Sequence, residues 1–408
     1  MSQTLITSQE LTRRFLDVLH SNMAIVKNMD LQYEAKFAEG GYDGQKIGPT
    51  LQIRKPNQFT VRTGWPMAQQ DMTETYASLT IDTVNGVDLN FPDADLALRI
   101  DDFEKRYIEP AAKRLAAEVD KTAGLYIKNH TYQVGGTAGT QPNTALIFAN
   151  AARKLKNQLV PIDGNIAAII TPETEAALVG GLTPLQFNPQ QAVSKMFETG
   201  QMSNMLGFNW YMSQVLSSHT GGTRTNTTPQ VNGATQGTAG TVLVKGAGVS
   251  PTWTVGDVFT MAGCYDVNPE TKQTLPYLKQ LVVTEASNAD GSGDGTITFE
   301  PALVISGAYQ NCSGYPTNSG AITWLGTASY TYSNDILMHK KAFAFASAPL
   351  VLPGGMDMAA TAEMDGLRVR FVRGYDIVNA RMLSRMDIFY GVTKLRPEWA
   401  TRVIGVGV

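Results

Sequence analysis

The side chains with the clearest potential for metal chemistry lie in residues 290–295, whose sequence is Asp-Gly-Ser-Gly-Asp-Gly. Carboxylates and a hydroxyl at alternate positions, with a glycine for a sharp turn, are typical of a calcium-binding loop. Such a loop needs a bidentate acid at its twelfth position, where this sequence has Pro301, with Glu300 one residue short. The segment also lies between two predicted strands instead of two helices. We therefore interpret it as a hairpin turn.

Catalytic motifs are absent from the sequence. It has no phosphate-binding Gly-x-x-x-x-Gly-Lys, no His-Glu-x-x-His, no Cys-x-x-Cys and no nucleophile elbow. Cys264 and Cys312 are too few for a disulfide scaffold or a cysteine-rich metal site, and the four histidines do not occur at ligand spacing. Asp101, Asp102 and Glu104 are interpreted as the solvated face of a helix. We therefore predict no catalytic residue, metal or cofactor, and a protein that is not an enzyme.

Three arginines form the most concentrated basic feature of the chain. Arg368, Arg370 and Arg373 alternate with apolar residues on a predicted strand, and Arg381 and Arg385 follow. They could contact nucleic acid, or they could pair with acidic residues across a subunit contact. The chain has 33 basic and 36 acidic residues and a net charge of −3, which gives no support to a nucleic-acid binder. The second interpretation is favoured.

The first hundred residues are predicted to contain one helix and two ribbons. Residues 7–28 form an amphipathic helix that either packs on its own domain or lies as an arm on a neighbouring subunit; the sequence leaves both open. Residues 50–92 alternate with period two. Lys55-Pro56-Asn57 is predicted as one turn and Asn85-Gly86 as a second, hairpin turn. Two ribbons without partners are expected to rest on other structure, such as another subunit.

The rest of the 408 residues predicts an α+β core with an insertion. A helix over 97–130, in which Pro110 marks either a kink or a new start, is followed by a helix at 143–158, a buried strand at 166–170 and a third helix from Pro172 to about Val179. Residues 222–333 are rich in Gly, Thr, Ser and Asn, and short strands recur between turns. This segment has only four basic and seven acidic residues, and we predict an all-β sandwich or barrel. Strand patterns resume from residue 342.

Membrane and secretion signals are missing. No apolar run is long enough to span a bilayer, and Arg13, Arg14 and Asp17 interrupt the N-terminal segment. We expect a protein that is cytoplasmic when made and has no membrane partner.

The order of these parts resembles a tailed-phage major capsid protein of the Hong Kong 97 fold, and the insertion makes it similar to the P-22-like coat proteins. The family's closing pattern is matched by residues 386–392 (Met-Asp-Ile-Phe-Tyr-Gly-Val), 396–398 (Arg-Pro-Glu) and 404–406 (Ile-Gly-Val). Within the insertion, residues 255–259 (Val-Gly-Asp-Val-Phe) and 261–263 (Met-Ala-Gly) resemble the family's Gly-Asp…Ala-Gly strand pair.

The resemblance implies a division of the chain into six parts. These are an N-terminal arm (1–44), an extended loop (45–95), a peripheral domain with a spine helix (96–159), a first axial part (160–217), an inserted all-β domain (218–335) and a second axial part with the C-terminal strand (336–408). In the family a charged loop of the insertion makes two-fold contacts. Here residues 223–240 contain only Arg224 as a charge, so a polar or relocated contact is expected.

The resemblance also implies a function and partners. It implies a self-assembling icosahedral shell of pentamers and hexamers around double-stranded DNA that is bound without sequence specificity. A scaffolding protein and a portal would be partners, and the virion would be the location. The assembly contacts that we expect are Arg54, Lys55, Arg62, Trp65, Arg368, Arg370 and Arg373.

Other classes remain open from sequence. One is a β-rich tail, adhesion or other binding protein, in which Trp253 and Trp324 would line an exposed groove. Another is a subunit of a bacterial protein-shell compartment, and a third is an unrecognised hydrolase.

Overall fold

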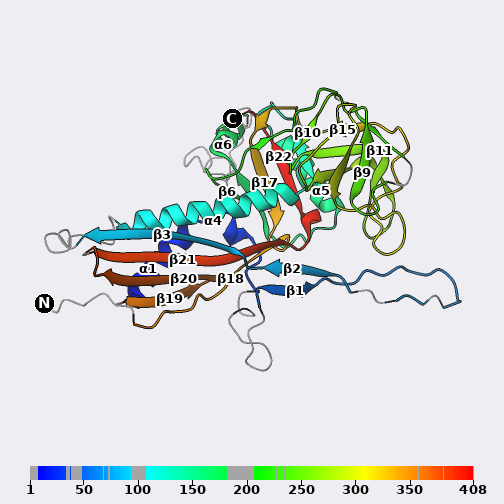
Figure 1. Ribbon diagram of the computed structural model, residues 1–408. Helices are drawn as coiled ribbons and strands as arrows, with labels where there is room; N and C mark the ends of the chain where they lie inside the picture. The colour runs from blue at the N-terminus through cyan, green and yellow to red at the C-terminus, as the bar shows by residue number, and fades with distance from the viewer. Residues whose placement is uncertain are drawn as a thin grey trace, which may run out of the picture. The chain divides into compact units, whose positions relative to one another are not determined.

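Figure 1 shows the computed structural model, which describes residues 8–33, 37, 48–67, 69–71, 74–92, 107–181, 206–226, 228–233, 236–355, 358–379 and 381–407. The chain forms two compact units. The first comprises Met1–Lys55, Tyr76–Ala123 and Phe343–Leu395, and the second comprises Pro56–Thr75, Gly124–Ala342 and Arg396–Val408. The part expected at 336–408 is therefore divided between the two units. No described helix is long and apolar enough to cross a membrane.

The first unit is built around a sheet whose central strand is β21 (Arg381–Lys394). This strand pairs with β20 (Leu367–Asp376) and β18 (Phe343–Ser347) along one edge and with β3 (Thr83–Pro92) along the other, and β19 (Met358–Met364) pairs with β20. All these pairings are antiparallel. Leu367, Val369 and Phe371 are buried while the arginines between them are half-buried, as the alternating pattern predicts. Because β21 pairs with β3, residues 343–395 join the first unit.

The prediction of a hairpin turn at Asn85-Gly86 is wrong. Both residues lie inside the continuous strand β3, opposite Ile388 and Asp387 of β21. A Cβ on Gly86 would stand 2.5 Å from Oδ1 of Asp387. The glycine therefore leaves room for a buried carboxylate on the neighbouring strand, and does not serve a turn.

The turn at Lys55-Pro56-Asn57 is also corrected. Strand β1 (Thr50–Arg54) pairs with β2 (Tyr76–Thr80), so residues 55–75 form one long loop between the two strands (Figure 1). The base of this hairpin is anchored in its own unit, because Ile53 and Leu79 pack in a buried cluster with Ala344, Ala346 and Leu395. The loop beyond the base also lies against its own chain, since Pro56–Thr75 belongs to the second unit and Phe59 and Val61 line a cavity there with Tyr309. The expectation of a ribbon without a partner in its own chain is therefore wrong.

The N-terminal helix α1 (Ser8–Asn22) packs against β19 and β20 of the same unit. Phe15, Leu16 and Leu19 are buried there. Of the two alternatives left open by the sequence, a helix on its own domain is the one observed.

The long helix α4 (Glu109–His130) has Pro110 in its first turn. Tyr107 and Ile108 directly before α4 are also helical, so the kink and the new start both stay predictions. Residues 97–106, including the acidic cluster at 101–104, lie outside the described residues. Asp120 of this helix is buried, and its carboxylate accepts hydrogen bonds from the backbone N–H groups of Ala24 (2.6 Å), Ile25 (3.1 Å) and Val26 (3.1 Å). One side chain thus joins the N-terminal segment to α4.

The second unit contains a five-stranded sheet in the order β4-β22-β17-β5-β6. These strands are β4 (Val134–Gly136), β22 (Ala400–Ile404), β17 (Asn334–His339), β5 (Ile166–Ile170) and β6 (Asn209–Met212). Every residue of β5, β17 and β22 is buried. Helix α5 (Ala145–Asn157) packs on β22 and β4, and α6 (Pro172–Gly181) is capped by the Thr171 hydroxyl, which accepts from the N–H of Thr174.

The same unit contains the segment that we call the β module, residues 219–332. It is built from β15 (Ile322–Trp324), β11 (Val258–Val267), β12 (Thr274–Val283), β14 (Gly295–Glu300), β9 (Thr241–Lys245) and β8 (Gln230–Val231) in that order, with the pairs β10 (Thr252–Trp253)–β13 (Ser287–Asn288) and β7 (His219–Thr220)–β16 (Thr331–Tyr332). The short strands that the sequence predicts at 241–244, 258–261, 281–284, 296–299 and 321–325 are confirmed as β9, β11, β12, β14 and β15, and the described residues of the module contain no helix. Trp253, Phe259 and Phe299 lie in its core, so Trp253 does not line an exposed groove.

The acidic run at 290–295 is a turn, as interpreted from the sequence. It leads from β13 into β14, and Oδ1 of Asp290 accepts the backbone N–H groups of Ser292 and Asp294, both at 2.9 Å. The described residues contain no group of three His, Cys, Asp or Glu side chains that could hold a metal ion.

Replacement of Asp120 is expected to destabilise the first unit. Asp120→Ala leaves three backbone N–H groups without their acceptor, and we expect a loss of about 3 kcal/mol in the free energy of unfolding. Asp120→Asn, which keeps one acceptor oxygen, should lose less. Urea denaturation followed by circular dichroism measures both, with Lys121→Ala at an exposed position of the same helix as control. Equal stabilities for Asp120→Ala and the control would contradict this role.

Candidate assembly surfaces

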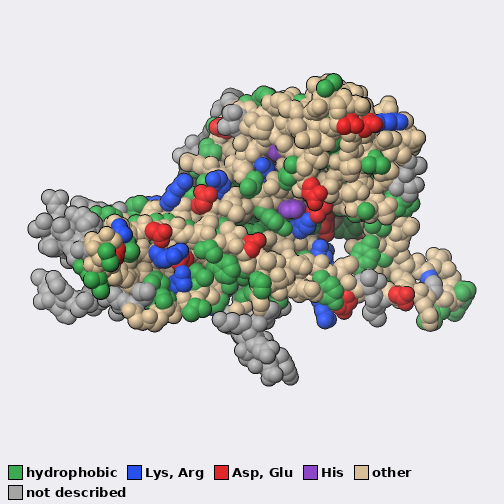
Figure 2. Space-filling view, viewed as in Figure 1, with side chains coloured by type: hydrophobic (Ala, Val, Ile, Leu, Met, Phe, Trp, Pro, Cys, Tyr) green, Lys and Arg blue, Asp and Glu red, His purple; other side chains and the backbone are tan. Residues whose placement is uncertain are grey.

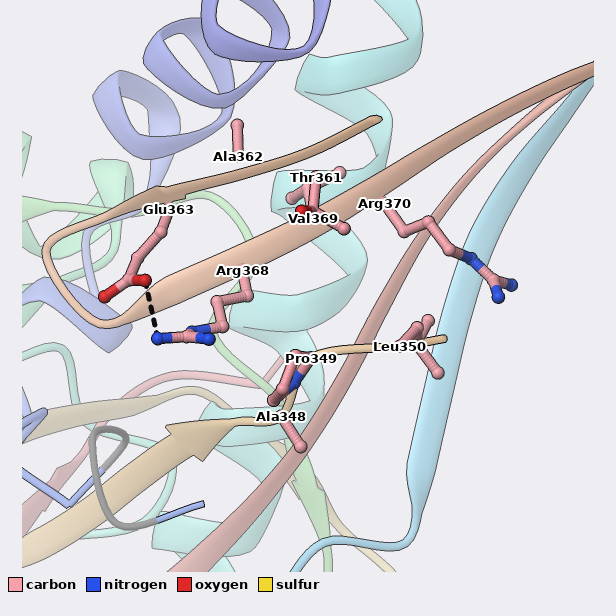
Figure 3. Close-up of a pocket in the computed structure, with 9 residues that line it drawn as sticks. All are labelled: Ala348, Pro349, Leu350, Thr361, Ala362, Glu363, Arg368, Val369 and Arg370. Carbon is pink, nitrogen blue, oxygen red and sulfur yellow. Dashed lines mark ion pairs between the residues drawn. The ribbon is translucent and has the colours of Figure 1, made fainter. Parts of the chain in front are cut away.

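Two arginines of β20 pair with acidic residues of their own chain. Arg368 contacts Glu363 of β19 at 2.5 Å (Figure 3). Arg370 donates to Asp387 of β21 at 2.6 Å. The strand register explains both pairs, because Glu363 lies opposite Arg368 and Asp387 lies opposite Arg370. The observed carboxylates belong to the same chain, and pairing of these arginines with acids across a subunit contact stays a prediction.

Three further arginines near this strand are also engaged. Arg385 donates to the second oxygen of Asp387 at 2.9 Å, and Arg381 donates to Asp376 at 3.0 Å. Arg373 is half-buried on the same strand. The basic face expected from the alternating sequence is therefore largely neutralised within the first unit. That Arg368, Arg370 and Arg373 contact a second copy stays a prediction.

The pocket between β20 and the segment after β18 is small. Its volume is about 180 Å³, and Pro349, Leu350, Thr361 and the Arg368–Glu363 ion pair line it (Figure 3). Residues 348–350 and 368–370 contribute no histidine, cysteine, serine or lysine to this pocket. Its lining suits a peptide segment or solvent better than acid–base chemistry.

The loop from Lys55 to Thr75 exposes a row of large apolar side chains. Val61 is 96% exposed and Trp65 is 98% exposed, and Phe59 and Met67 are also exposed. Figure 2 shows apolar side chains at the end of this loop. Apolar groups gathered in this way on a surface mark an interaction site. Trp65 is one of the contact residues expected from the sequence, whereas Phe59, Val61 and Met67 are identified by their exposure in the structure.

Polar contacts brace the same loop. The guanidinium of Arg62 donates to the carbonyl oxygens of Gly64 and Pro66, and the backbone N–H and C=O of Thr60 bond to the Gln70 amide at 2.8 and 2.6 Å. Arg62 thus holds the turn that presents Trp65. Arg54 and Lys55 lie where β1 ends and the loop begins, with Arg54 exposed and Lys55 half-buried.

One protein-family model matches this chain. The family model described as "P22 coat protein - gene protein 5" matches residues 8–408, which is nearly the whole chain. The chain belongs to the P22 coat protein family.

Solved phage structures give a wider comparison. The chain is similar to a structure from Mycobacterium phage Che8 at 14% identity, with a TM-score of 0.49 over 93% of this chain and 90% of that chain. It is similar to the capsid of the Cyanophage P-SCSP1u at 12% identity, with a TM-score of 0.44 over 88% of this chain and 84% of that chain. It is also similar to the bacteriophage PhiM1 mature capsid at 11% identity, with a TM-score of 0.41 over 87% of this chain and 82% of that chain. A search of curated protein sequences finds no match.

In this coat-family chain the only charged residue of the sequence 223–240 is Arg224, and its side chain is not exposed. Arg224 is buried, forms an ion pair with Asp257 at 3.0 Å and lies over the Trp324 ring at 4.4 Å. A contact made by this stretch with another copy would therefore have to be polar or apolar.

The scattered titratable residues of the coat-family chain are held by structural contacts. His130 contacts Glu300 at 3.3 Å, and the buried His339 contacts Asp163 at 3.1 Å. Both cysteines are buried and free, and burial raises the pKa of the Cys264 thiol to about 12. A thiol with so high a pKa stays protonated and unreactive near neutral pH.

Asp335 is a buried acid that the sequence analysis missed. It lies on β17 and is fully buried, and one carboxylate oxygen accepts the backbone N–H of Thr171 at 2.8 Å. Burial raises the pKa of this carboxyl to about 7, and the nearby Glu173 of α6 acts in the same direction. The apolar residues that follow Asp335 in the sequence predict a strand, but they do not show that this carboxyl is buried in the sheet.

Asp335 should make the stability of the coat-family chain fall as the pH rises from about 4 to about 7, with no further loss above that range. The pKa is about 4 in the unfolded chain and about 7 in the folded one. The stabilisation is therefore fully present below pH 4 and is lost as the pH rises toward 7. His219, whose pKa is lowered by burial, contributes the opposite slope near pH 6.5. Urea denaturation of wild type and Asp335→Asn between pH 5 and 8 isolates the Asp335 contribution, and parallel curves would contradict it.

Proposed function

We propose that this chain is a major capsid protein that self-assembles, through repeated contacts between identical copies, into an icosahedral shell around double-stranded viral DNA. Membership of the P22 coat protein family supports a structural role in the virion. The observation that carries the assembly step is the exposed apolar row on the 55–75 loop. The proposal includes synthesis in the host cytoplasm, a scaffolding protein and a portal as partners, and no enzymatic activity.

The extended loop is the proposed principal contact between copies. Its base is fixed by the buried cluster around Leu79, and its tip is shaped by Arg62. Complete burial of a large apolar side chain contributes about 1.5–3 kcal/mol, so Trp65, Val61, Phe59 and Met67 together can stabilise a contact substantially. A patch on one copy that binds a different patch on the next generates a ring by repetition.

The remaining parts receive roles in the same proposal. The β module would be the inserted domain of the coat-protein fold and would bridge capsomers, with polar side chains replacing the ion pairs that Arg224 cannot make. Helix α4 would be the spine helix, and the second unit's five-stranded sheet would form the axial part. Packaged DNA would be enclosed without sequence-specific contacts, since the β20 arginines are paired internally.

Shortening the extended loop should abolish shell formation without unfolding the subunit. Replacing residues 55–75 by Asn-Gly joins the paired residues Arg54 and Tyr76 by a two-residue hairpin turn. We expect this variant to sediment as monomers or small oligomers, while the wild type forms closed shells in negative-stain electron microscopy.

A single substitution gives the matched comparison. Trp65→Ser should reduce the yield of shells at least tenfold at fixed protein concentration. Ile162→Ser, at a position of the second unit that is 81% exposed, should leave the yield unchanged. Intact shells from the short-loop chain, or equal yields from the two serine variants, would overturn the assignment of this contact.

A further inference from the structure

The β module is joined to the rest of the second unit by a short neck. We use this name for residues 218–222, where the chain enters the module, and residues 330–333, where it leaves. The two strands of the neck, β7 and β16, pair antiparallel, with His219 opposite Tyr332. The chain then passes from β16 into β17, the middle strand of the five-stranded sheet. A change at the neck would therefore alter how the module is held on that sheet.

His219 is buried inside this neck, and only 2% of the residue is exposed. Its Nε2 lies 3.0 Å from Oδ1 of Asp257, and its ring meets the Tyr332 ring edge-on, with the centroids 5.4 Å apart. A Cβ on Gly256 would stand 3.2–3.3 Å from the His219 ring, so the backbone of the module also packs closely against it. A neutral imidazole that donates from Nε2 suits these contacts.

The carboxylate that accepts from this ring is shared with other donors. Oδ2 of Asp257 forms an ion pair with Arg224 at 3.0 Å and accepts the backbone N–H of Gly222, in the neck, at 3.1 Å. Burial alone would raise the pKa of this carboxyl, but the hydrogen bond from His219 and the charge of Arg224 hold it at about 2. The negative charge of Asp257 is therefore already balanced by an arginine.

Two further cations reach the neck from other elements. Lys128 of α4 donates to the carbonyl oxygen of Ser218 at 3.2 Å. Arg402 of β22 donates to the carbonyl oxygen of Gly256 at 2.8 Å. Burial lowers the pKa of the His219 ring, and the charges of Arg402 and Lys128 lower it further, whereas the neighbouring carboxylate raises it. Protonation of the ring is thus disfavoured as long as the neck stays closed.

We propose that the neck is an acid-sensitive hinge, in which protonation of His219 loosens the β module from the five-stranded sheet. The neutral ring fits between the shared carboxylate and the surrounding cations. The protonated ring places a further positive charge beside Arg224, Arg402 and Lys128, and it adds an N–H donor at Nδ1 in a buried site. An uncompensated buried charge is costly. The neck lowers this cost by opening to water.

The module can loosen at the neck without unfolding. Its own core is a cluster of buried side chains that all lie between residues 231 and 322. A separate cluster joins the module to the sheet and the neck, and it includes Val258, Val282, Tyr332 and Ile404. Opening of the neck therefore leaves the core of the module intact.

A second histidine at the same junction has the opposite tendency. His130, the last residue of α4, contacts Glu300 of the module at 3.3 Å, and protonation favours this pair. Both side chains are partly exposed, so the pair contributes little to stability. The acid response of the junction should therefore follow His219.

The direction of the response follows from the two pKa values of His219. The pKa is about 6.5 in an open, solvated neck and lower in the closed neck. The closed neck is therefore fully favoured above pH 6.5, and this advantage is lost as the pH falls. Between pH 6.5 and the pKa of the closed neck, each unit of pH raises the opening equilibrium constant by up to about tenfold.

Hydrogen–deuterium exchange of the full-length chain measures this opening, in free subunits or in shells. The reporters are the backbone amides of Gly221, which bonds to the carbonyl oxygen of Tyr330, and of Gly222. After correction for the intrinsic effect of pH on exchange, we expect their protection factors to fall about threefold or more from pH 7 to pH 5.5. The paired amides of β11 and β12 should keep their protection.

Two histidine variants form a matched pair for this experiment. His219→Gln keeps an N–H donor for Asp257 but cannot titrate, and His130→Gln removes the other imidazole of the junction. The acid response should be lost in His219→Gln and kept in His130→Gln. Equal responses of the two variants, or wild-type protection that does not change with pH, would overturn the proposal. A nuclear magnetic resonance titration of the wild type needs no variant, and a His219 ring that protonates at pH 6.5 or above would also overturn it.

Discussion

The architecture of the first unit depends on one buried charge, the carboxylate of Asp387 at the centre of β21. It is fully buried, and a buried charge persists only when it is paired and hydrogen-bonded. Arg370 from β20 supplies one partner at 2.6 Å and Arg385 supplies the other at 2.9 Å. On the opposite strand Gly86 leaves the space that the carboxylate occupies. A slip in the register of β3 or β20 against β21 would separate these groups, so the ion pairs specify the pairing of three strands.

This constraint determines which surface remains for association. Because Arg368 and Arg370 are paired with Glu363 and Asp387, the strand with the most basic sequence is not a free cationic patch. Arg224 likewise forms an ion pair with Asp257 in the β module. Several basic side chains of this near-neutral chain are thus paired with acidic side chains of the same chain. The exposed apolar side chains of the described residues include those of the 55–75 loop, as well as Ile377 and Val378. The loop is held at its base by a buried cluster and at its tip by hydrogen bonds to the backbone.

Local sequence patterns predicted several helices and strands. Where the structure differs from these predictions, contacts between residues far apart in the chain explain the difference. Alternation predicted β20, the apolar run predicted β5, and turn spacing predicted five strands of the β module. Asn85-Gly86 was taken for a turn because the cause of that glycine, Asp387, lies about 300 residues away in the chain. The contacts of Asp120 could not be predicted from local pattern, because its carboxylate accepts from a segment 94–96 residues earlier in the chain. Of the expected contact residues, Trp65 could be named from sequence, but the internal partners of Arg368 and Arg370 required the strand register.

The central claim is that copies of this chain build a shell by seating the 55–75 loop on a neighbouring copy. Electron cryomicroscopy of particles formed by the full chain tests it most directly. The account predicts closed shells in which density for Trp65 and Val61 lies buried against the adjacent copy. Particles in which this loop stays solvent-exposed, or a chain that forms no shells, would contradict it.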